Sequence, residues 1–222
     1  VPEDRRESEV ARFNAAAAAV ADRLAERASA ATGVAAEVLG ATASLARDRG
    51  WARAVAKLVK GGTSAEAATV TATDQFVEMF QKVGGLMAER ATDLRDIRDR
   101  VVAELSGQPE PGIPHSETPA VLCAEDLAPA DTAGLDPETI VALVTRLGGP
   151  TSHTAIISRQ LGIPCIVAAE GLDRLEEGTE VLVDGTRGLV EVGMDPEVAR
   201  ERVAEDAERR EDAKDLRLAV GS

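Results

Sequence analysis

The residues best suited to chemistry lie in one short segment, residues 148–159, with the sequence GGPTSHTAIISR. Its two glycines allow a tight turn. Thr151 and Ser152 are good caps for a helix that we expect over residues 152–161. The imidazole of His153 would lie over the first turn of that helix, where free N–H groups and the helix dipole favour an anion. The segment therefore places a nucleophilic ring beside a potential anion site.

A histidine in this position can carry a phosphoryl group. Neutral imidazole is nucleophilic near pH 7 without an additional base, and phosphoryl transfer depends mainly on positioning and charge stabilisation. The dipole contributes about 0.3–2 kcal/mol to holding the anion, which suits a carrier that must release the group again. Arg159, farther along the helix, can reach toward the same group. A core histidine near a helix start is the alternative, and the combination of turn, caps and arginine argues against it.

Helical periodicity extends over residues 5–107. Apolar residues recur there at three- and four-residue spacing, and Gly33, Gly61–Gly62 and Gly84–Gly85 separate the expected helices. Thr63 and Glu66 would form a capping box for the helix after Gly62. Several helices with short connections indicate a small bundle. The expected inward-facing residues are Val10, Phe13, Ala17, Val20, Leu24, Val34, Val38, Ala41, Leu45, Trp51, Val55, Leu58, Phe76, Phe80, Met87, Leu94, Ile97 and Val101.

The pattern changes after residue 107. Residues 108–118 (QPEPGIPHSET) are rich in proline and polar side chains, which predicts a linker in which His115 is solvated. Residues 119–195 contain short apolar segments that predict strands mixed with short helices, and hence an α/β unit around His153. Residues 196–222 contain a charged, alanine-rich helix that we expect to face solvent. The expected strands cover residues 120–123, 140–144, 163–168, 181–183 and 189–192, the last two as a hairpin.

Composition limits the partners. Of the 222 residues 44% are hydrophobic but only 2% aromatic, and the net charge is −14. That charge argues against nucleic acid and anionic membranes, since both require a basic face, and it is compatible with a basic protein partner. No apolar run approaches about 18 residues, so we expect no membrane span. Cys123 and Cys165 lie in apolar runs, which predicts core thiols in a reducing cytoplasm.

Residues 148–159 resemble the phosphohistidine signature of phosphoenolpyruvate-using enzymes, and the following residues 161–164 (LGIP) are also similar to that family. Enzyme I of the sugar phosphotransferase system shares this signature with pyruvate phosphate dikinase and phosphoenolpyruvate synthase. Residues 125–133 (EDLAPADTA) resemble the segment that precedes the Enzyme I active site, and residues 89–97 (ERATDLRDI) resemble its last bundle helix. The chain thus resembles the N-terminal HPr-binding and phosphohistidine domain of Enzyme I.

The resemblance implies a fold of mixed α+β and α/β type. A helical HPr-docking subdomain, residues 1–107, would be inserted in a swivelling β/α phosphohistidine domain, residues 119–195, with a linker between them and a closing linker helix at residues 196–222. Such a phosphoenolpyruvate-protein phosphotransferase is cytoplasmic. It would accept a phosphoryl group from phosphoenolpyruvate on its C-terminal domain, carry it on His153, and pass it to the small protein HPr for sugar uptake.

The resemblance also assigns roles around the imidazole. It implies that the Thr132 hydroxyl hydrogen-bonds the ring of His153 and that Arg159 contacts the phosphate. Thr151 and Ser152, at the start of the same helix, are further candidates to contact the phosphate or to orient the ring. Pro150 stands where many relatives have arginine, so one phosphate contact would be absent.

For HPr docking, we expect Arg90, Leu45 and Trp51 near the interface. Trp51 follows Gly50, which could give its ring a partly exposed place at a helix start, although a core position is equally compatible with the sequence. Residues 41–45 (ATASL) lack the histidine and methionines that are common on the docking helix of relatives.

The family's first strand and its phosphoenolpyruvate-binding barrel lie outside these 222 residues, which also lack an initiating Met. We therefore expect a shortened piece of a longer protein. The Mg²⁺ site belongs to the barrel, so no metal or other cofactor is expected in this chain.

Two alternatives stay open. One is the swivelling carrier domain of a dikinase or synthase, which would serve a nucleotide site, but such a carrier does not need a docking bundle. The other is a regulatory module whose histidine is phosphorylated without passing the group to HPr. With HPr as the partner, the isolated chain should exchange phosphoryl groups only with HPr.

Overall fold

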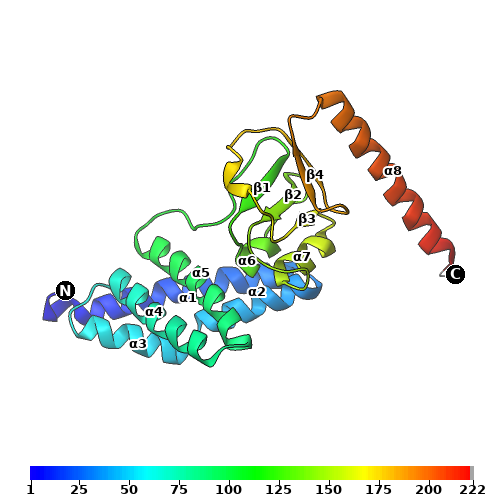
Figure 1. The fold of residues 1–222 in the computed structure, drawn as a ribbon. Coiled ribbons are helices and arrows are strands. Elements are labelled where there is room, and N and C mark those ends of the chain that lie inside the picture. Colours follow the sequence, from blue (N-terminus) through cyan, green and yellow to red (C-terminus); the bar gives the residue numbers. More distant parts are fainter. Residues whose placement is uncertain (221–222) are drawn as a thin grey trace.

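A computed structural model describes the backbone of residues 1–220 and the side chains of residues 1–213. A helical bundle and a smaller α/β unit lie side by side, and a final helix, α8, extends away from the α/β unit (Figure 1). The mixed fold predicted from the sequence is confirmed.

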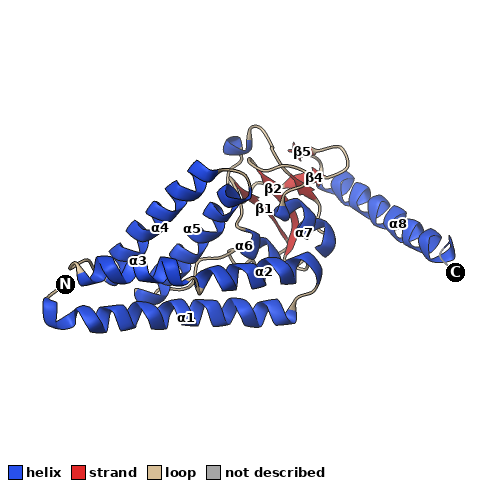
Figure 2. Ribbon diagram, turned by 90° about the horizontal axis from the view of Figure 1, so that it is seen from below, coloured by secondary structure: helices blue, strands red, loops and turns tan. Residues whose placement is uncertain are grey.

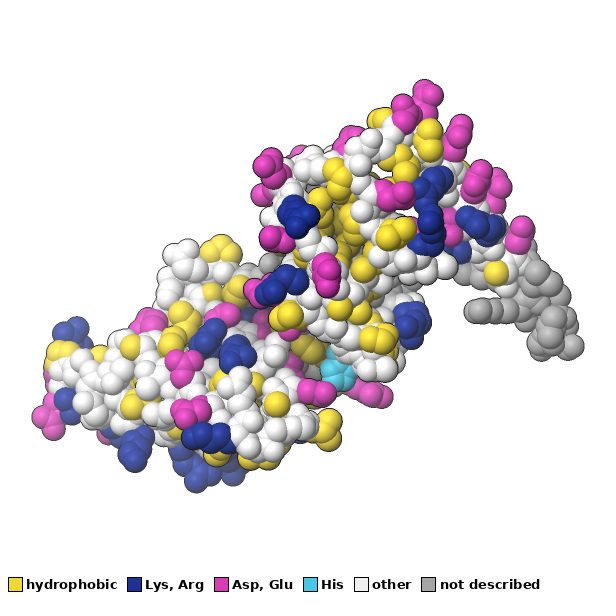
Figure 3. Space-filling model, viewed as in Figure 1, with side chains coloured by type: hydrophobic (Ala, Val, Ile, Leu, Met, Phe, Trp, Pro, Cys, Tyr) yellow, Lys and Arg dark blue, Asp and Glu magenta, His cyan; other side chains and the backbone are white. Residues whose placement is uncertain are grey.

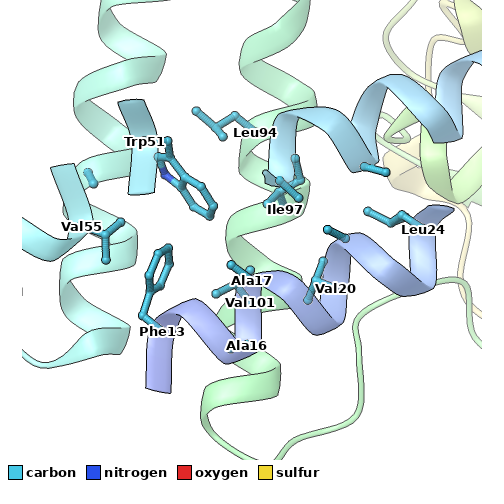
Figure 4. Close-up of a cluster of buried hydrophobic side chains, with 14 of the residues drawn as sticks. Phe13, Ala16, Ala17, Val20, Leu24, Trp51, Val55, Leu94, Ile97 and Val101 are labelled. Atoms are coloured by element: carbon cyan, nitrogen blue, oxygen red, sulfur yellow. The ribbon is translucent and has the colours of Figure 1, made fainter. Parts of the chain in front are cut away.

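The bundle is built from antiparallel helices joined by short turns. Its apolar side chains form one core, in which the rings of Phe13 and Trp51 meet edge to face with centroids 5.4 Å apart (Figure 4). Val55, Ile97 and Val101 are fully buried in the same core. The helices are α1 (Arg6–Ala30), α2 (Gly33–Ala46), α3 (Arg49–Lys60), α4 (Ala65–Val83) and α5 (Leu86–Leu105), preceded by a 3-10 turn at Glu3–Arg5.

The buried face of α2 is wider than the predicted stripe, and one predicted core residue, Ala41, is exposed. Leu39 and Ala43 face the bundle core, whereas Ala35 and Val38 pack against the α/β unit. The predicted apolar stripe covers one side of α2. In the structure two sides of the helix are buried, one against the bundle core and one against the α/β unit.

The predicted capping box at the start of α4 is wrong by one residue. Ser64 is the N-cap, and its Oγ accepts a hydrogen bond from the Ala67 N–H at 3.3 Å. Glu66 does not reach back to the helix start but pairs with Arg12 of α1, with an N–O distance of 2.8 Å. A partner on another helix thus replaces the local contact that the spacing suggested.

Trp51 lies in the core, which is one of the two positions that the sequence left open, and the alternative of a partly exposed ring is wrong. Its side chain is 1% exposed, and its indole N–H donates to the Thr73 hydroxyl at 3.2 Å. Asp48 caps α3 and accepts from the Trp51 backbone N–H at 2.7 Å. Because α3 begins at Arg49, Trp51 falls on the same inward face as Val55, four residues later.

The α/β unit contains a parallel sheet in the order β1–β2–β3 and an antiparallel hairpin of β4 and β5 (Figure 2). The central strand β2 is buried except at Val141, as expected for a strand with neighbours on both edges. The elements are β1 (Ala120–Ala124), α6 (Pro129–Ala133), β2 (Ile140–Thr145), α7 (His153–Leu161), β3 (Cys165–Ile166), a 3-10 turn (Leu172–Arg174), β4 (Val181–Asp184) and β5 (Leu189–Val192).

The prediction of two core thiols is wrong for Cys123, which is exposed, while Cys165 is half-buried. Cys123 lies on β1, which has a neighbouring strand on one side only. Successive side chains of a strand point to opposite faces of the sheet, so an apolar run does not bury all its members on such an edge.

The two parts are joined by side-chain packing as well as by the chain. Ile157 of α7 is fully buried against Ala35 and Val38 of α2, and Ala130 of α6 belongs to the bundle core. Residues 108–118 contain neither helix nor strand, but Ile113 packs against the α/β core. The short helices α6 and α7 are therefore the contact between the bundle and the sheet.

The closing helix α8 (Pro196–Val220) begins directly after the hairpin. Arg202 holds its first turns to that hairpin through Glu191, with an N–O distance of 2.6 Å, and through Asp184 at 3.5 Å. Over the residues described, no helix combines the length and the apolar character needed to cross a lipid bilayer.

Candidate functional site

The site begins at the carboxyl end of β2, where open α/β sheets commonly bind ligands. Gly148 has φ +99°, a backbone conformation that glycine adopts without strain. Ser152 is the N-cap of α7, and its Oγ accepts from the Ala155 N–H at 3.3 Å. The predicted cap is confirmed for Ser152, whereas Thr151 lies one residue before it and is exposed. Gly162, with φ +74°, ends the helix.

His153 is the first residue of α7, and its side chain is exposed. The inward side of the same helix is tightly held, because Thr154, Ile157 and Ser158 are buried. The first N–H groups of α7 have no partner within the helix, and the Ser152 Oγ accepts from one of them, that of Ala155. The arrangement fixes the helix while leaving the imidazole open to a partner.

Thr132 does not bond the imidazole as the resemblance implied. It is fully buried on α6, and its Oγ1 lies 3.3 Å from Oγ1 of Thr154 and 3.4 Å from the Ala128 carbonyl oxygen. The space between α6 and α7 is closed to solvent, so the nearest polar group for this hydroxyl is the buried Thr154. Thr132 thus contacts the residue next to His153.

Arg159 is exposed near the end of α7. It lines a depression together with Pro150 of the turn before His153, with residues 162–165 and with Arg210 of α8. The depression extends from Arg159 to Pro150, and its lining includes neither His153 nor Thr132.

Helix α5 contributes residues that the sequence patterns did not single out. Arg100 is only 3% exposed, and its guanidinium pairs with Asp96 at 2.9 Å, Glu110 at 3.0 Å and Asp131 at 2.5 Å. Asp93, Asp96 and Arg100 recur at three- and four-residue spacing, so they share one face of α5. This regular spacing of charged residues next to the apolar stripe of α5 is the sequence feature that could have identified the cluster.

The carboxyl group of Asp93 lies near His153 and is largely removed from solvent. Burial raises the pKa of Asp93 to about 6, and electrostatic interactions with His153 and Arg90 act in the opposite direction. Burial also raises the pKa of Asp131 to about 6, with Asp96 adding to the effect and Arg100 opposing it. Both carboxyl groups therefore titrate just below neutral pH.

The raised pKa of Asp93 gives a test by stability. The folded state binds this proton more tightly than the unfolded chain, so the stabilisation is complete below the ordinary value of 3.8 and is lost as the pH rises through about 6. Asp93→Asn should therefore raise the free energy of unfolding by about 1–3 kcal/mol at pH 8 and leave it unchanged at pH 3.5. Urea unfolding at the two pH values measures this.

Asp99→Asn is the matched control, because Asp99 is exposed on the same helix. It should change stability little at either pH. Equal effects of Asp93→Asn on the free energy of unfolding at pH 3.5 and pH 8 would contradict the raised pKa of this carboxyl group.

The three residues expected near a partner occupy different environments. Arg90 is exposed close to the start of α5, Leu45 is half-buried against the bundle core, and Trp51 is inside it. Acidic and basic side chains are interspersed over the visible face of the bundle (Figure 3). Among the side chains described, no group of three or more His, Cys, Asp or Glu residues could hold a metal ion.

Two family models match the sequence. Residues 1–90 match the N-terminal region of PEP-utilising enzymes, and residues 116–188 match the mobile domain of PEP-utilising enzymes. Together they include the bundle helices through the start of α5, and the site from Thr132 to Arg159.

Relatives and solved structures agree with these models. A phosphoenolpyruvate-protein phosphotransferase of Streptomyces coelicolor is 42% identical over 95% of this chain and 38% of its own length. One of Haloferax volcanii is 44% identical over 68% of this chain and 26% of its own length. The chain thus spans well under half of these curated relatives.

Among solved structures, the NMR structure of Enzyme I (nEIt) matches with a TM-score of 0.71 and 29% identity, over 95% of this chain and 88% of that one. The N-terminal domain of Enzyme 1 - Nitrogen matches with a TM-score of 0.58 and 27% identity, over 91% of this chain and 85% of that one.

Proposed function

Because the chain belongs to the family of PEP-utilising enzymes, we propose that it is a phosphoryl-carrying domain in which His153 holds the phosphoryl group. The observation that carries the proposal is the exposed imidazole on the capped first turn of α7. A neutral ring nitrogen attacks phosphorus, the bond from phosphorus to the donor's oxygen or nitrogen breaks, and the first turn of α7 stabilises the transferred anion.

The donor and acceptor follow from the relatives. In the proposal, phosphoenolpyruvate supplies the group from another part of the same enzyme, and the protein HPr receives it for sugar uptake. The relatives that bear the name phosphoenolpyruvate-protein phosphotransferase are much longer than this chain, which leaves room for a separate phosphoenolpyruvate site. Phosphoenolpyruvate is a metabolite of the cytoplasm, so we place the protein there.

Within the site, we propose that Arg159 contacts the phosphoryl group and that the backbone around Thr151 and Ser152 lies beside it. HPr would dock on the bundle close to Arg90 and α2. The charge of −14 suits a partner with a basic rim, because complementary charge speeds encounter and weakens with salt. Leu45, half-buried against the bundle core, would lie next to this surface. Trp51 is buried and would contribute only to the stability of the bundle.

Loading from phosphorylated HPr tests the proposal. Phosphorylated HPr mixed with the chain should increase its intact mass by one phosphoryl group, and fresh unphosphorylated HPr should remove that group again. A folded chain that gains no mass from HPr would overturn the proposal. Loading that required a nucleotide-binding domain and ATP instead would favour the carrier domain of a dikinase, and loading without return to HPr would favour a regulatory module.

A further inference from the structure

We propose that the ion pair between the buried Arg100 and the half-buried Asp131 is a positioning device for phosphoryl transfer at His153, an inference that rests on the proposed function. The pair joins the bundle helix α5 to the short helix α6 with an N–O distance of 2.5 Å. From α6 a second contact, between Thr132 and Thr154, reaches the first turn of α7. The path ends one residue from the imidazole.

The bundle end of the path is rigid. Arg100 is 3% exposed, and its contact with Asp96 on the same helix holds the guanidinium in place, whereas its contact with Glu110 comes from the irregular linker outside the bundle. A buried guanidinium loses hydration, so its position is set by the carboxylates that surround it. Asp131 is therefore attached to a fixed point on α5.

The helix that carries Asp131 cannot fix its own position. Helix α6 has five residues, too few to be stable by itself in water. It is held from a second direction by Arg27, which donates to the Ala130 carbonyl oxygen at 3.0 Å. These contacts with α5 and α1, together with the apolar packing of Ala130 and Ala133, set the position of the Thr132 hydroxyl.

The contact between Thr132 and Thr154, which connects α6 to α7, is shielded from solvent. Thr132 is fully buried and Thr154 is 6% exposed, so their hydroxyl contact does not compete with water. Thr154 is the second residue of α7. A shift or rotation of Thr132 thus acts directly on the helical turn that carries His153.

Directional contacts matter at the start of α7 because its apolar packing against the bundle is not directional, and the other hydrogen bond to the bundle, from Gln160 to the Thr32 carbonyl oxygen at 2.8 Å, lies at the far end of the helix. Ile157 holds α7 against Ala35 and Val38 of α2 by apolar contact, which favours burial but tolerates sliding and rotation. Hydrogen bonds to charged groups and hydroxyls depend steeply on distance and angle. Since a misplacement of 1 Å can cost about a hundredfold in rate, this path is suited to setting the attack geometry of the imidazole.

The test compares Asp131→Asn with Glu110→Gln. Both variants replace a carboxylate that pairs with Arg100 by an amide of similar shape, but only Asp131 belongs to α6. Asp131→Asn should slow transfer from phosphorylated HPr about tenfold, the loss of one charge-assisted contact, without changing the Kd for HPr. Glu110→Gln should stay within about twofold of the wild type, and the two melting temperatures should fall by similar amounts.

A second variant tests the same chain of contacts in case Asp131→Asn does not fold. Thr132→Val keeps the side-chain shape but removes the hydroxyl contact one step closer to α7. It should slow transfer as Asp131→Asn does, and the double variant should lose little more, because both changes break one path. Additive losses would show that the two residues act separately.

Amide hydrogen exchange gives a readout that does not depend on transfer. Asp131→Asn should speed exchange at Thr154 and Ala155, whereas Glu110→Gln should not. If the folded Asp131→Asn variant transfers and exchanges like the wild type, the positioning role is overturned while the proposed function stands. If even the wild type takes no phosphoryl group from HPr, the proposed function fails, and unchanged exchange in Asp131→Asn would overturn the positioning of α7 separately.

Discussion

His153→Ala should abolish phosphorylation of the chain by phosphorylated HPr, with no slower residual route. The imidazole is the proposed acceptor, and alanine leaves no nucleophile on the first turn of α7. Because His153 is exposed, its removal should leave the melting temperature nearly unchanged. A rapid-quench time course followed by intact mass measures the loss.

The chain supplies its own control for this variant. His115, the other histidine, lies in the irregular segment between the bundle and the α/β unit. His115→Ala should be phosphorylated at the wild-type rate. Retention of the phosphoryl group in His153→Ala together with its loss in His115→Ala would remove the basis of the account.

Arg159→Ala should slow transfer by about ten- to a hundredfold. A charge-assisted contact to phosphate contributes about 1.5–3 kcal/mol, and each 1.4 kcal/mol on the barrier corresponds to about a factor of ten in rate. Arg159 lines the depression that extends to the glycine turn before His153, and it is exposed, so the fold should tolerate its loss. Single-turnover transfer from phosphorylated HPr provides the rate.

Arg174→Ala is the matched control, since Arg174 is an exposed arginine in the same α/β unit, in the 3-10 turn after β3. It removes the same charge at a distance from the glycine turn and should change the rate by less than about twofold. Equal slowing by both variants would show that Arg159 acts only through net charge, and loss of folding with Arg159→Ala would show a structural role.

Local patterns predicted the parts of the site that depend on neighbouring residues. Ser152 caps α7 and the helix ends at Leu161, as expected, because both ends are set by side chains and backbone within one helical turn. Apolar spacing likewise predicted the bundle helices, because one buried stripe for each helix is sufficient to indicate its period. The strands were predicted for the same reason, although β3 is shorter than its apolar segment.

Contacts between distant residues could not be predicted in this way. Asp131 lies 31 residues after Arg100, and the spacing on α5 does not reveal which carboxylate completes the pair. The sequence did not show whether Trp51 faces solvent or the core. The position at which α3 begins decides this and places the ring against Phe13. The resemblance implied a hydrogen bond between the Thr132 hydroxyl and His153. Because α6 packs against α7, the hydroxyl contacts Thr154 instead.

The most direct test is to locate the phosphoryl group. The chain would be loaded from phosphorylated HPr, digested at alkaline pH, and its peptides sequenced by tandem mass spectrometry. We expect one phosphoryl group on the peptide that contains His153, lost in acid and stable in alkali as a phosphoramidate is. A phosphoryl group on His115, or an acid-stable ester on Ser152 or Thr151, would contradict it.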